Sequence, residues 1–370
     1  MELYVYDSEM TLQGIVEKIT SLIWTRRYWS CGEFKLLVPF TEQHSRLLVK
    51  KLLIMKRGDN EAGEIRYVNI KKNSQGLEEI EVQGKFITSW IGKRIVRNQI
   101  ITTENTQNIL YRIVSENITN PSAPERAIPN VHIANDPDTG SGNIDYVSEP
   151  FINALLACET AAKAAKLGYK IYTDVKTKQH YFSVYEGRDL TADQTENPPC
   201  VFSQEFDNIV EQEYTNSIEN FKTTAYVGGE EIEGVARKVA ISGSAAAGLD
   251  RDEVFVNATD IKQSYEENEV QVTLTDQEYL SLLAARGASE LEQYAETLSF
   301  SSNINTHGNL KYREDYDLGD QVTCINKRWG IKINVRITEI TETYQQNIEE
   351  IDITFGESLP ALIDKIRQLR

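Results

Sequence analysis

The sequence consists largely of short runs in which apolar and polar residues alternate, with turn-forming residues between them. In CGEFKLLVPF, Phe34, Leu36 and Val38 fall on one face of an expected strand. The runs LLIMKRG, EIRYVNIKKN and LEEIEVQGKF follow, separated by GDNEAG and NSQG, which supply the Gly, Asn and Asp that hairpin turns require. Strands at a spacing of roughly ten residues predict an antiparallel barrel or sandwich over residues 1–98.

Helical spacing replaces this pattern in the middle of the chain. Residues 102–118 have one apolar face. An alanine-rich segment at residues 151–167 is a second expected helix, with Ser148 as its N-cap and Gly168 at its end. The apolar face of the first helix consists of Ile109, Leu110, Ile113 and Val114. These segments, with two strands that follow, predict a small α/β unit.

Strand character resumes from about residue 199 and is interrupted once more by a helix. Thr275 and Glu278 have the spacing of a capping box and mark the start of that helix. In the strand that includes residues 331–340, three apolar residues alternate with three polar ones, which predicts a half-buried strand. The apolar residues are Ile333, Val335 and Ile337, and the polar ones are Asn334, Arg336 and Thr338.

Size and charge limit the class of protein. A chain of 370 residues exceeds one ordinary hydrophobic core, so roughly two to four folding units are expected. The 56 acidic residues outnumber the 39 basic ones and give a formal charge of −17, which opposes specific recognition of phosphate or anionic lipid. Neither a signal peptide nor a long apolar run is present in the sequence, so we expect a protein that is made in the cytosol and is not inserted in a membrane.

The residues that usually carry chemistry are scattered. The cysteines have no CxxC spacing, which argues against a zinc knuckle or a redox pair and favours small core residues. The histidines stand in separate segments without HxxxH spacing, and GxSxG, GxGxxG and GxxxxGK do not occur. We therefore predict no catalytic residue, no metal site and no cofactor. These cysteines are Cys31, Cys158, Cys200 and Cys324, and the histidines are His44, His132, His180 and His307.

The segment DPDTGSGNID is an acidic loop with the composition of a calcium site. Asp136, Asp138 and Asn143 offer oxygens, but the spacing lacks the twelve-residue pattern that ends in a bidentate Glu. Asp, Gly and Asn are also the ordinary residues of turns, so a plain turn is the favoured interpretation.

An aromatic–arginine cluster occurs in SLIWTRRYW, where Trp24, Arg26, Arg27 and Trp29 lie close together. Trp and Arg are enriched in the energetic centres of protein interfaces, which makes this cluster a candidate interface. Packing in the core of a barrel strand explains the residues equally well, and stacking on a sugar is a third interpretation.

Three longer phrases follow one another in a distinctive order. The first is LYVYDSEMTLQGIVEKITSLIWTRRYWSCGEFKLLVP; the second is YFSVYEGRDLT followed by PPCVFSQEFDNIVEQEYTNS; the third is DYDLGDQVTCINKRWGIKINVRITEITETY, with IDITFGE after it. In the order and spacing of these phrases, the chain resembles the siphovirus tail-hub or tail-associated protein family, which is related to the baseplate hub of contractile-tailed phages. The likeness extends from about residue 3 to residue 357.

The resemblance implies an α+β, mainly β fold. Two tail-tube-like antiparallel β-barrel domains would be accompanied by two smaller helix-containing insert domains. The implied segments are residues 1–98 for the first barrel, 99–198 for an α/β insert, 199–240 with 298–356 for the second barrel, and 241–297 with 357–370 for a helix-bearing insert and a terminal helix.

The resemblance also implies a structural, non-enzymatic function. Three copies would form a ring at the distal tail that adapts the sixfold tube to threefold tip components and lets DNA pass without binding it specifically. The partners would be further copies of the chain, the tail tube or distal tail protein, and tail-tip, fibre or spike proteins. The protein would be made in the bacterial host cytoplasm and reside in the virion tail of a phage or of a prophage-derived particle.

Two other functions stay open at this point. A carbohydrate-binding tail adhesin would expose Trp24, Trp29 and tyrosines as a platform, and a peptidoglycan hydrolase would need paired carboxylates across a cleft. Many proteins of this kind carry a further C-terminal part that digests cell wall or binds a receptor. Here we expect either that this function resides on another protein or that the chain is a minimal hub. A basic terminal helix is a candidate docking element for such a partner, or simply a frayed end. Its basic residues are Lys365, Arg367 and Arg370.

Overall fold

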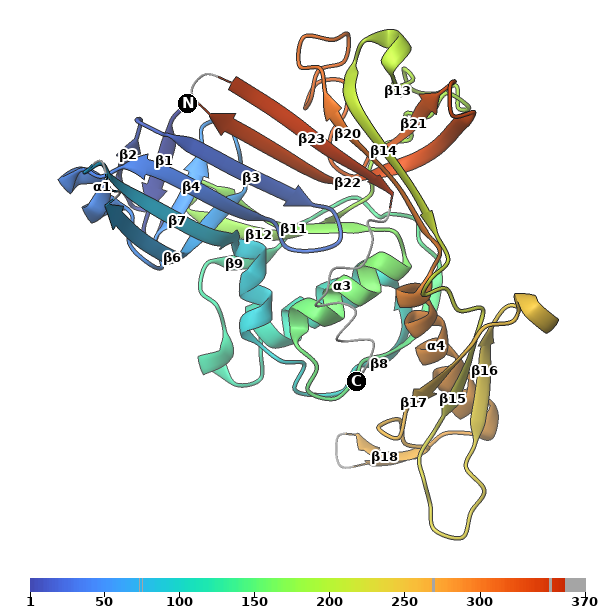
Figure 1. The fold of residues 1–370 in the computed structure, drawn as a ribbon. Coiled ribbons are helices and arrows are strands. Elements are labelled where there is room, and N and C mark those ends of the chain that lie inside the picture. The colour runs from blue at the N-terminus through green and yellow to red at the C-terminus, as the bar shows by residue number, and fades with distance from the viewer. Residues whose placement is uncertain (73, 75, 268–269, 346–347, 357–370) are drawn as a thin grey trace.

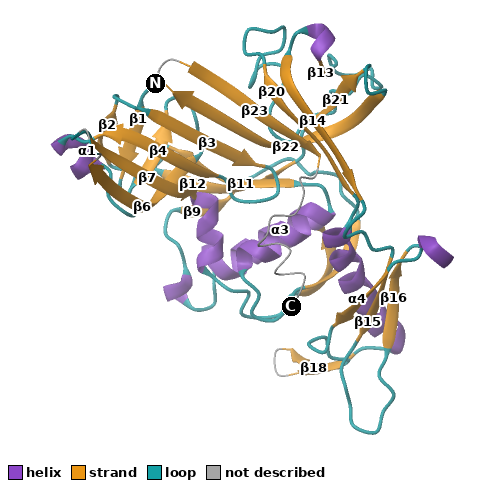
Figure 2. Cartoon of the chain, viewed as in Figure 1, coloured by secondary structure: helices purple, strands orange, loops and turns teal. Residues whose placement is uncertain are grey.

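The fold is mainly β and is organised around one large sheet, with smaller layers of helix and strand on one side of it (Figures 1 and 2). The computed structural model describes residues 1–72, 74, 76–267, 270–345 and 348–356. No helix in these residues is long and apolar enough to cross a membrane. The large sheet consists of two sets of strands, from the two ends of the chain, which we call its first and second halves.

The first half comes from the N-terminal region and alternates as the sequence predicts. Phe34, Leu36 and Val38 are almost fully buried, which confirms the predicted apolar face of their strand. Short turns join most of the strands, and one helix and one 3₁₀ segment complete the region. The elements are β1 (Leu3–Tyr6), β2 (Leu12–Val16), β3 (Ser21–Arg27), β4 (Glu33–Pro39), α1 (Glu42–Leu47), β5 (Leu53–Lys56), β6 (Ala62–Lys72), β7 (Glu78–Phe86) and η1 (Ile87–Lys93).

The second half comes mostly from the C-terminal region. Its elements are β13 (Val201–Ser203), η4 (Gln204–Phe206), β14 (Ile209–Ser217), β20 (Thr297–Ile304), β21 (Gln321–Asn326), β22 (Ile331–Gln345) and β23 (Ile348–Gly356). Strand β22 pairs with β3 and so joins the halves; we call this pair the seam. The main path is β14-β20-β23-β22-β3-β4-β7-β6-β5-β1-β2, which leaves β14 and β2 as its outer strands among the described residues.

A helix-and-strand unit lies beneath the first half (Figure 1). Helices α2 and α3 pack against each other, and β11 pairs with β12, which pairs with β9. Ile109, Leu110, Ile113 and Val114 are fully buried, which confirms the predicted helical face. The elements are β8 (Ile101–Asn105), α2 (Thr106–Val114), η2 (Ser115–Thr119), η3 (Pro124–Arg126), β9 (Val131–Ile133), β10 (Asn143–Val147), α3 (Ala154–Ala164), β11 (Gly168–Asp174) and β12 (Gln179–Tyr185).

A second, smaller unit is inserted between β14 and β20. Helix α4 covers one face of the three-stranded sheet β16-β15-β17 and starts at the predicted capping box of Thr275 and Glu278. The elements are β15 (Thr224–Gly228), β16 (Val239–Gly243), η5 (Gly248–Asp250), β17 (Glu253–Asn257), β18 (Ser264–Glu267), β19 (Val270–Thr273), α4 (Asp276–Leu291) and η6 (Glu292–Tyr294).

The two halves of the sheet have separate hydrophobic cores. Trp24, Phe34 and their neighbours form one cluster in the first half, whereas Phe202 and Phe300 belong to a distinct cluster in the second half. A further cluster fills the space between the first half and helices α2 and α3. All four cysteines are buried and unpaired, as predicted for small core residues.

The structure confirms the mainly β, α+β class but not the predicted barrel architecture. Within the described residues the large sheet, which takes the strands of both predicted barrels, is open and does not form two closed barrels. The sequence could not reveal this arrangement, because alternation fixes which side chains face inward but leaves the partner of each outer strand unspecified.

Three local predictions are wrong. Gly168 does not end α3, because the helix stops at Ala164, Lys166 adopts the left-handed conformation with a φ of +57°, and Gly168 is the first residue of β11. Asn153, and not Ser148, caps α3, and the hydroxyl of Ser148 instead accepts a hydrogen bond from the backbone N–H of Ile100. In β22, Arg336 and Thr338 are buried although they were placed on the solvent face. Both residues hydrogen bond to backbone carbonyls, so their polar groups are satisfied inside the protein.

Candidate functional site

Charged and polar side chains lie on both faces of the seam, next to buried apolar residues such as Trp24 and Ile340. Arg26 lies opposite Ile340 and Trp24 lies opposite Glu342, so these four side chains share one face. On the other face Arg27 donates to Glu339 at 2.6 Å and to Glu33 at 2.8 Å. The hydrophobic core of the first half lies on one side of the seam and that of the second half on the other. Side-chain ion pairs and hydrogen bonds therefore contribute to the contact between the two halves.

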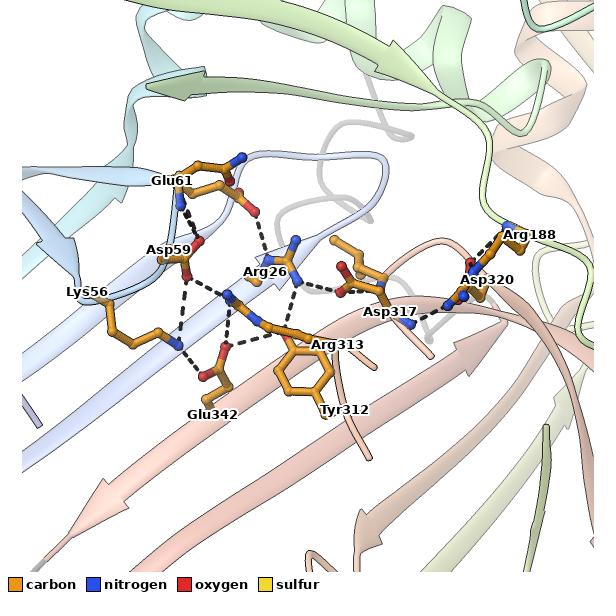
Figure 3. A network of polar contacts seen from close by, with 12 residues as sticks. Arg26, Lys56, Asp59, Glu61, Arg188, Tyr312, Arg313, Asp317, Asp320 and Glu342 are labelled. Carbon is orange, nitrogen blue, oxygen red and sulfur yellow. Dashed lines mark hydrogen bonds and ion pairs between the residues drawn. The ribbon is translucent and has the colours of Figure 1, made fainter. Parts of the chain in front are cut away.

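Arg26 is the centre of the first of these faces (Figure 3). Its Nε donates to Glu61 at 2.7 Å, and its Nη1 donates to Asp317 at 2.6 Å and to the Tyr312 hydroxyl at 2.8 Å. The side chain is only 4% exposed. Burial by itself lowers the pKa of Arg26, but Glu61, Tyr312 and Asp317 outweigh burial and raise it, so the guanidinium stays charged.

A second group of charges surrounds Glu342. Lys56 forms an ion pair with Glu342. The Nη2 atom of Arg313 lies 3.4 Å from Oε1 of Glu342 and 2.7 Å from Oδ2 of Asp59. The hydroxyl of Tyr344 also donates to Glu342. Burial lowers the pKa of Lys56 even though Glu342 and Asp59 act to raise it, so the attraction does not fully offset the loss of solvent.

Much of this network comes from one connection, residues 309–320 between β20 and β21, which we call the strap. The strap supplies Tyr312, Arg313 and Asp317 to the two groups above. At its end, Asp320 accepts hydrogen bonds from Arg188, with Nη2 and Oδ2 2.7 Å apart. The strap thus contacts the first half of the sheet, strand β22 and the segment after β12 (Figure 3).

Two glycines let the strap approach closely. A Cβ on Gly187 would lie 1.9 Å from the carbonyl oxygen of Gly319, so only glycine fits there. Gly319 itself has a φ of +96° and packs against the ring of Tyr28, which is fully buried. The end of the strap is therefore fixed by backbone packing as well as by charge.

A hollow of about 580 Å³ opens beside the network. Lys56, Tyr312, Arg313, Glu342 and Tyr344 line it, together with the N-terminal residues. The cations and carboxylates of the network are nearly equal in number. The cations are Arg26, Lys56 and Arg313, and the carboxylates are Asp59, Glu61, Asp317 and Glu342. The arrangement is suited to holding chain segments together rather than to attracting one strongly charged ligand.

The structure separates the residues of the predicted aromatic–arginine cluster. Trp24 is fully buried against Phe34 and Phe86, and Arg26 is buried in the network. Trp24 therefore supports the core interpretation, and it is not available to a sugar-binding platform. Arg27 is 28% exposed, and Trp29 is partly buried against the second-half core.

Other predicted positions have structural partners or lie outside the described residues. Asp136 accepts hydrogen bonds from Tyr111 on α2, from Ser183 and from the backbone of Val184 on β12, so its carboxylate ties the loop to these two elements. Lys365, Arg367 and Arg370 of the predicted docking helix lie outside the described residues.

Sequence reasoning missed most of the network. Lys56, Asp59 and Glu342 are separated along the chain, and a lone charge in a strand or turn is usually exposed. The one available signal was the density of charged and tyrosine residues in LKYREDYDLGD.

Comparison with known proteins gives a consistent family and fold. The family described as Siphovirus ReqiPepy6 Gp37-like protein matches residues 2–357. No curated protein matches the sequence. Among solved structures, the 43 kDa tail protein of prophage MuSo2 from Shewanella oneidensis has a TM-score of 0.57 at 12% identity, covering 96% of this chain and 98% of that one.

Two further solved structures have the same fold. Prophage tail protein gp18 from Listeria monocytogenes has a TM-score of 0.55 at 11% identity, covering 100% of this chain and 98% of that one. A tail protein from Neisseria meningitidis has a TM-score of 0.53 at 11% identity and covers 96% of both chains. At such low identity the likeness concerns the fold alone.

Proposed function

Because the chain belongs to the Siphovirus ReqiPepy6 Gp37-like protein family, we propose that it is a structural hub subunit, three copies of which form a ring at the distal tail. The observation that carries the structural tail role is the family match over residues 2–357. The chains that share its fold are described as tail proteins of prophages or bacteria, which supports the same role. Membership of this family supports a structural rather than a catalytic function in the virion tail.

The open sheet supports the ring. Strands β2 and β14 each pair on one side only within the described residues, so they present free backbone N–H and C=O groups. A closed cyclic ring joins two different surfaces of each subunit, and the outer strands are two such surfaces. In the ring, each half of the sheet would act as one tube-like barrel unit, so that three chains supply six similar units to the sixfold tube.

The proposed units start from the segments expected from the sequence, which are residues 1–98 for the first tube-like unit and residues 199–240 with 298–356 for the second. Strands β15 and β16 pair in a separate sheet and pack against α4, so they belong with the insert and not with the second unit. The inserts are residues 99–198 and residues 241–297 with 357–370. The separate cores of the two sheet halves support this division.

The charge of the chain supports passage of DNA. With a formal charge of −17, a ring of three copies is strongly acidic. Carboxylates that line a lumen repel phosphates and prevent DNA from adhering to the wall. Substitution of lumen-facing acidic residues by lysine should slow DNA release, whereas the same change on the outer surface should not.

The proposed partners are other tail components. The tail tube or distal tail protein would contact one side of the ring, and tip, fibre or spike proteins the other. Arg27 and Trp29 keep a proposed role at an interface, and Lys365, Arg367 and Arg370 keep a proposed role in docking. Synthesis in the cytoplasm of the bacterial host precedes assembly.

The mass of the protein in solution tests this proposal. Light scattering over a range of concentrations should detect a species of three chains, alone or after addition of the tail-tube protein, and electron microscopy should then show a ring. A strict monomer that also fails to assemble with the tail-tube protein would overturn the hub proposal. Retention of such a monomer on host glycans would favour the adhesin instead.

A further inference from the structure

The strap connects the two halves of the sheet at a place apart from the backbone pairing of the seam. Arg313 and Asp317 reach Asp59 and Arg26 in the first half, although the strap itself follows β20 of the second half. Asp320 at the end of the strap holds Arg188. The same short segment therefore contacts both halves and the chain that leaves the α/β unit (Figure 3).

These contacts lie where they can restrict the angle between the two halves of the sheet. They lie on one face of β3 and β22, while Arg27 and Glu339 pair on the other face. Adjacent strands tolerate a wide range of twist, so a two-strand junction by itself fixes the angle loosely. The ion pairs from the strap to Arg26 and Asp59 connect the two halves away from the paired backbones, and they restrict this twist.

Resting on the proposed function, we propose that the strap locks the two halves of the sheet at one angle about the seam, and that the ring closes only when this lock is in place. The outer strands β2 and β14 belong to different halves. Their relative orientation therefore depends on the angle at the seam. A subunit with a loose seam would present these strands at variable angles, and a closed ring requires one angle in every copy.

Ion pairs suit such a lock better than apolar packing. A buried ion pair adds little net stability, since loss of solvent offsets the attraction, but it requires defined positions of donor and acceptor. Arg26 has this character, because three partners on separate segments meet one planar guanidinium. The lowered pKa of Lys56 fits the same pattern, because burial outweighs the attraction of its carboxylate partners.

The decisive variant is Arg26→Met/Glu61→Gln. The Arg26→Met change removes the guanidinium that holds Asp317 of the strap. The Glu61→Gln change removes the charge that would otherwise be left buried without its partner. Asp317→Asn is a milder variant for the case in which the double variant does not fold, because Asp317 is 43% exposed. Arg112→Met is the matched control, since it also removes an arginine ion pair, on α2 and away from the seam.

Two measurements on the full chain test the lock. Hydrogen exchange at low concentration should become about tenfold faster or more for the amides of β3 and β22 in the strap variants, with the rest of the sheet unchanged. Light scattering under conditions where the wild type forms the ring should show that these variants stay monomeric. The control should behave as the wild type does in both measurements.

The outcomes separate the lock from the hub proposal. Unchanged exchange at the seam, or a normal ring from a variant with fast exchange at the seam, would overturn the lock. If the wild type itself forms no ring, alone or with the tail-tube protein, the hub proposal fails. In that case the exchange measurement still decides whether the strap fixes the seam.

Discussion

Arg26 and Asp317 are 291 positions apart in the sequence, yet their side chains lie 2.6 Å apart across the junction of the two sheet halves. The contact joins a strand from the start of the chain to a loop near its end. Non-local contacts of this kind form only after the intervening chain has been arranged. We therefore expect the seam to be completed late in folding, after the two separate hydrophobic cores.

Trp24 anchors the first of those cores. Its ring is fully buried against Phe34 and Phe86. Trp24→Ala should lower the free energy of unfolding by about 3–5 kcal/mol, because it leaves a large cavity. Urea denaturation measures the change. Trp24→Phe is the control and should cost less than about 1.5 kcal/mol, since the indole N–H has no partner among the described residues.

Lys56 and Glu342 form a buried ion pair whose members depend on each other. Lys56→Met should lower the free energy of unfolding by about 3–5 kcal/mol, because it leaves Glu342 buried with one cation fewer. Lys56→Met/Glu342→Gln should recover a large part of that loss, since the amide stays polar but carries no charge. A double-mutant cycle in urea measures the coupling, and strictly additive losses would contradict the pairing.

The carboxyl group of Asp59 should make the protein sensitive to acid. Burial acts to raise the pKa of Asp59, but Arg313, Arg26 and Lys56 outweigh it and hold the pKa below the usual value for an aspartate. A carboxyl whose pKa is lower in the folded state stabilises the fold above its unfolded pKa, and this contribution is lost as pH falls through the folded pKa.

Unfolding measured from pH 7 down to below about pH 4 tests this effect. Asp59→Asn should be less stable than the wild type at neutral pH, and the difference between the two should shrink in acid. Glu314→Gln changes an exposed carboxylate of the strap and should follow the wild-type profile. A constant difference between Asp59→Asn and the wild type at every pH would contradict the assignment.

Gly187 should be intolerant of any side chain. Gly187→Ala would bring a Cβ to 1.9 Å from the carbonyl oxygen of Gly319, and this contact involves backbone that a rotamer change cannot relieve. We expect a lower melting temperature and faster hydrogen exchange in the strap. Gly142→Ala has open space around its Cβ and should be neutral or slightly stabilising.

The sequence predicts much of the local structure, because periodicity reports burial directly. The faces of Leu36 and Ile109 follow from alternation and helical spacing, and the capping box at Thr275 follows from two residues three positions apart. The prediction of Ser148 as the N-cap of α3 was wrong because Asn153, which immediately precedes the helix, is the N-cap. Such local competition between similar cap residues is not decided by spacing alone.

The architecture and the network lie beyond this kind of reasoning. Alternation does not specify that β22 pairs with β3, so the open sheet could not be distinguished from two barrels. Arg336 is buried on a predicted solvent face because Gly319, distant in the sequence, accepts its hydrogen bond. The charged residues of the network look like ordinary surface residues until the fold brings their partners together.

The burial of all four cysteines makes the protein convenient for site-directed labelling. Burial raises the pKa of Cys31 to about 11 and that of Cys200 to about 12, and it also raises the pKa of Cys158 and Cys324. Because the thiolate is the reactive form, none of these should compete for a maleimide probe. Spin labels at Lys71→Cys and Lys332→Cys, both on exposed positions of opposite sheet halves, would then report distances across the molecule with every native thiol in place.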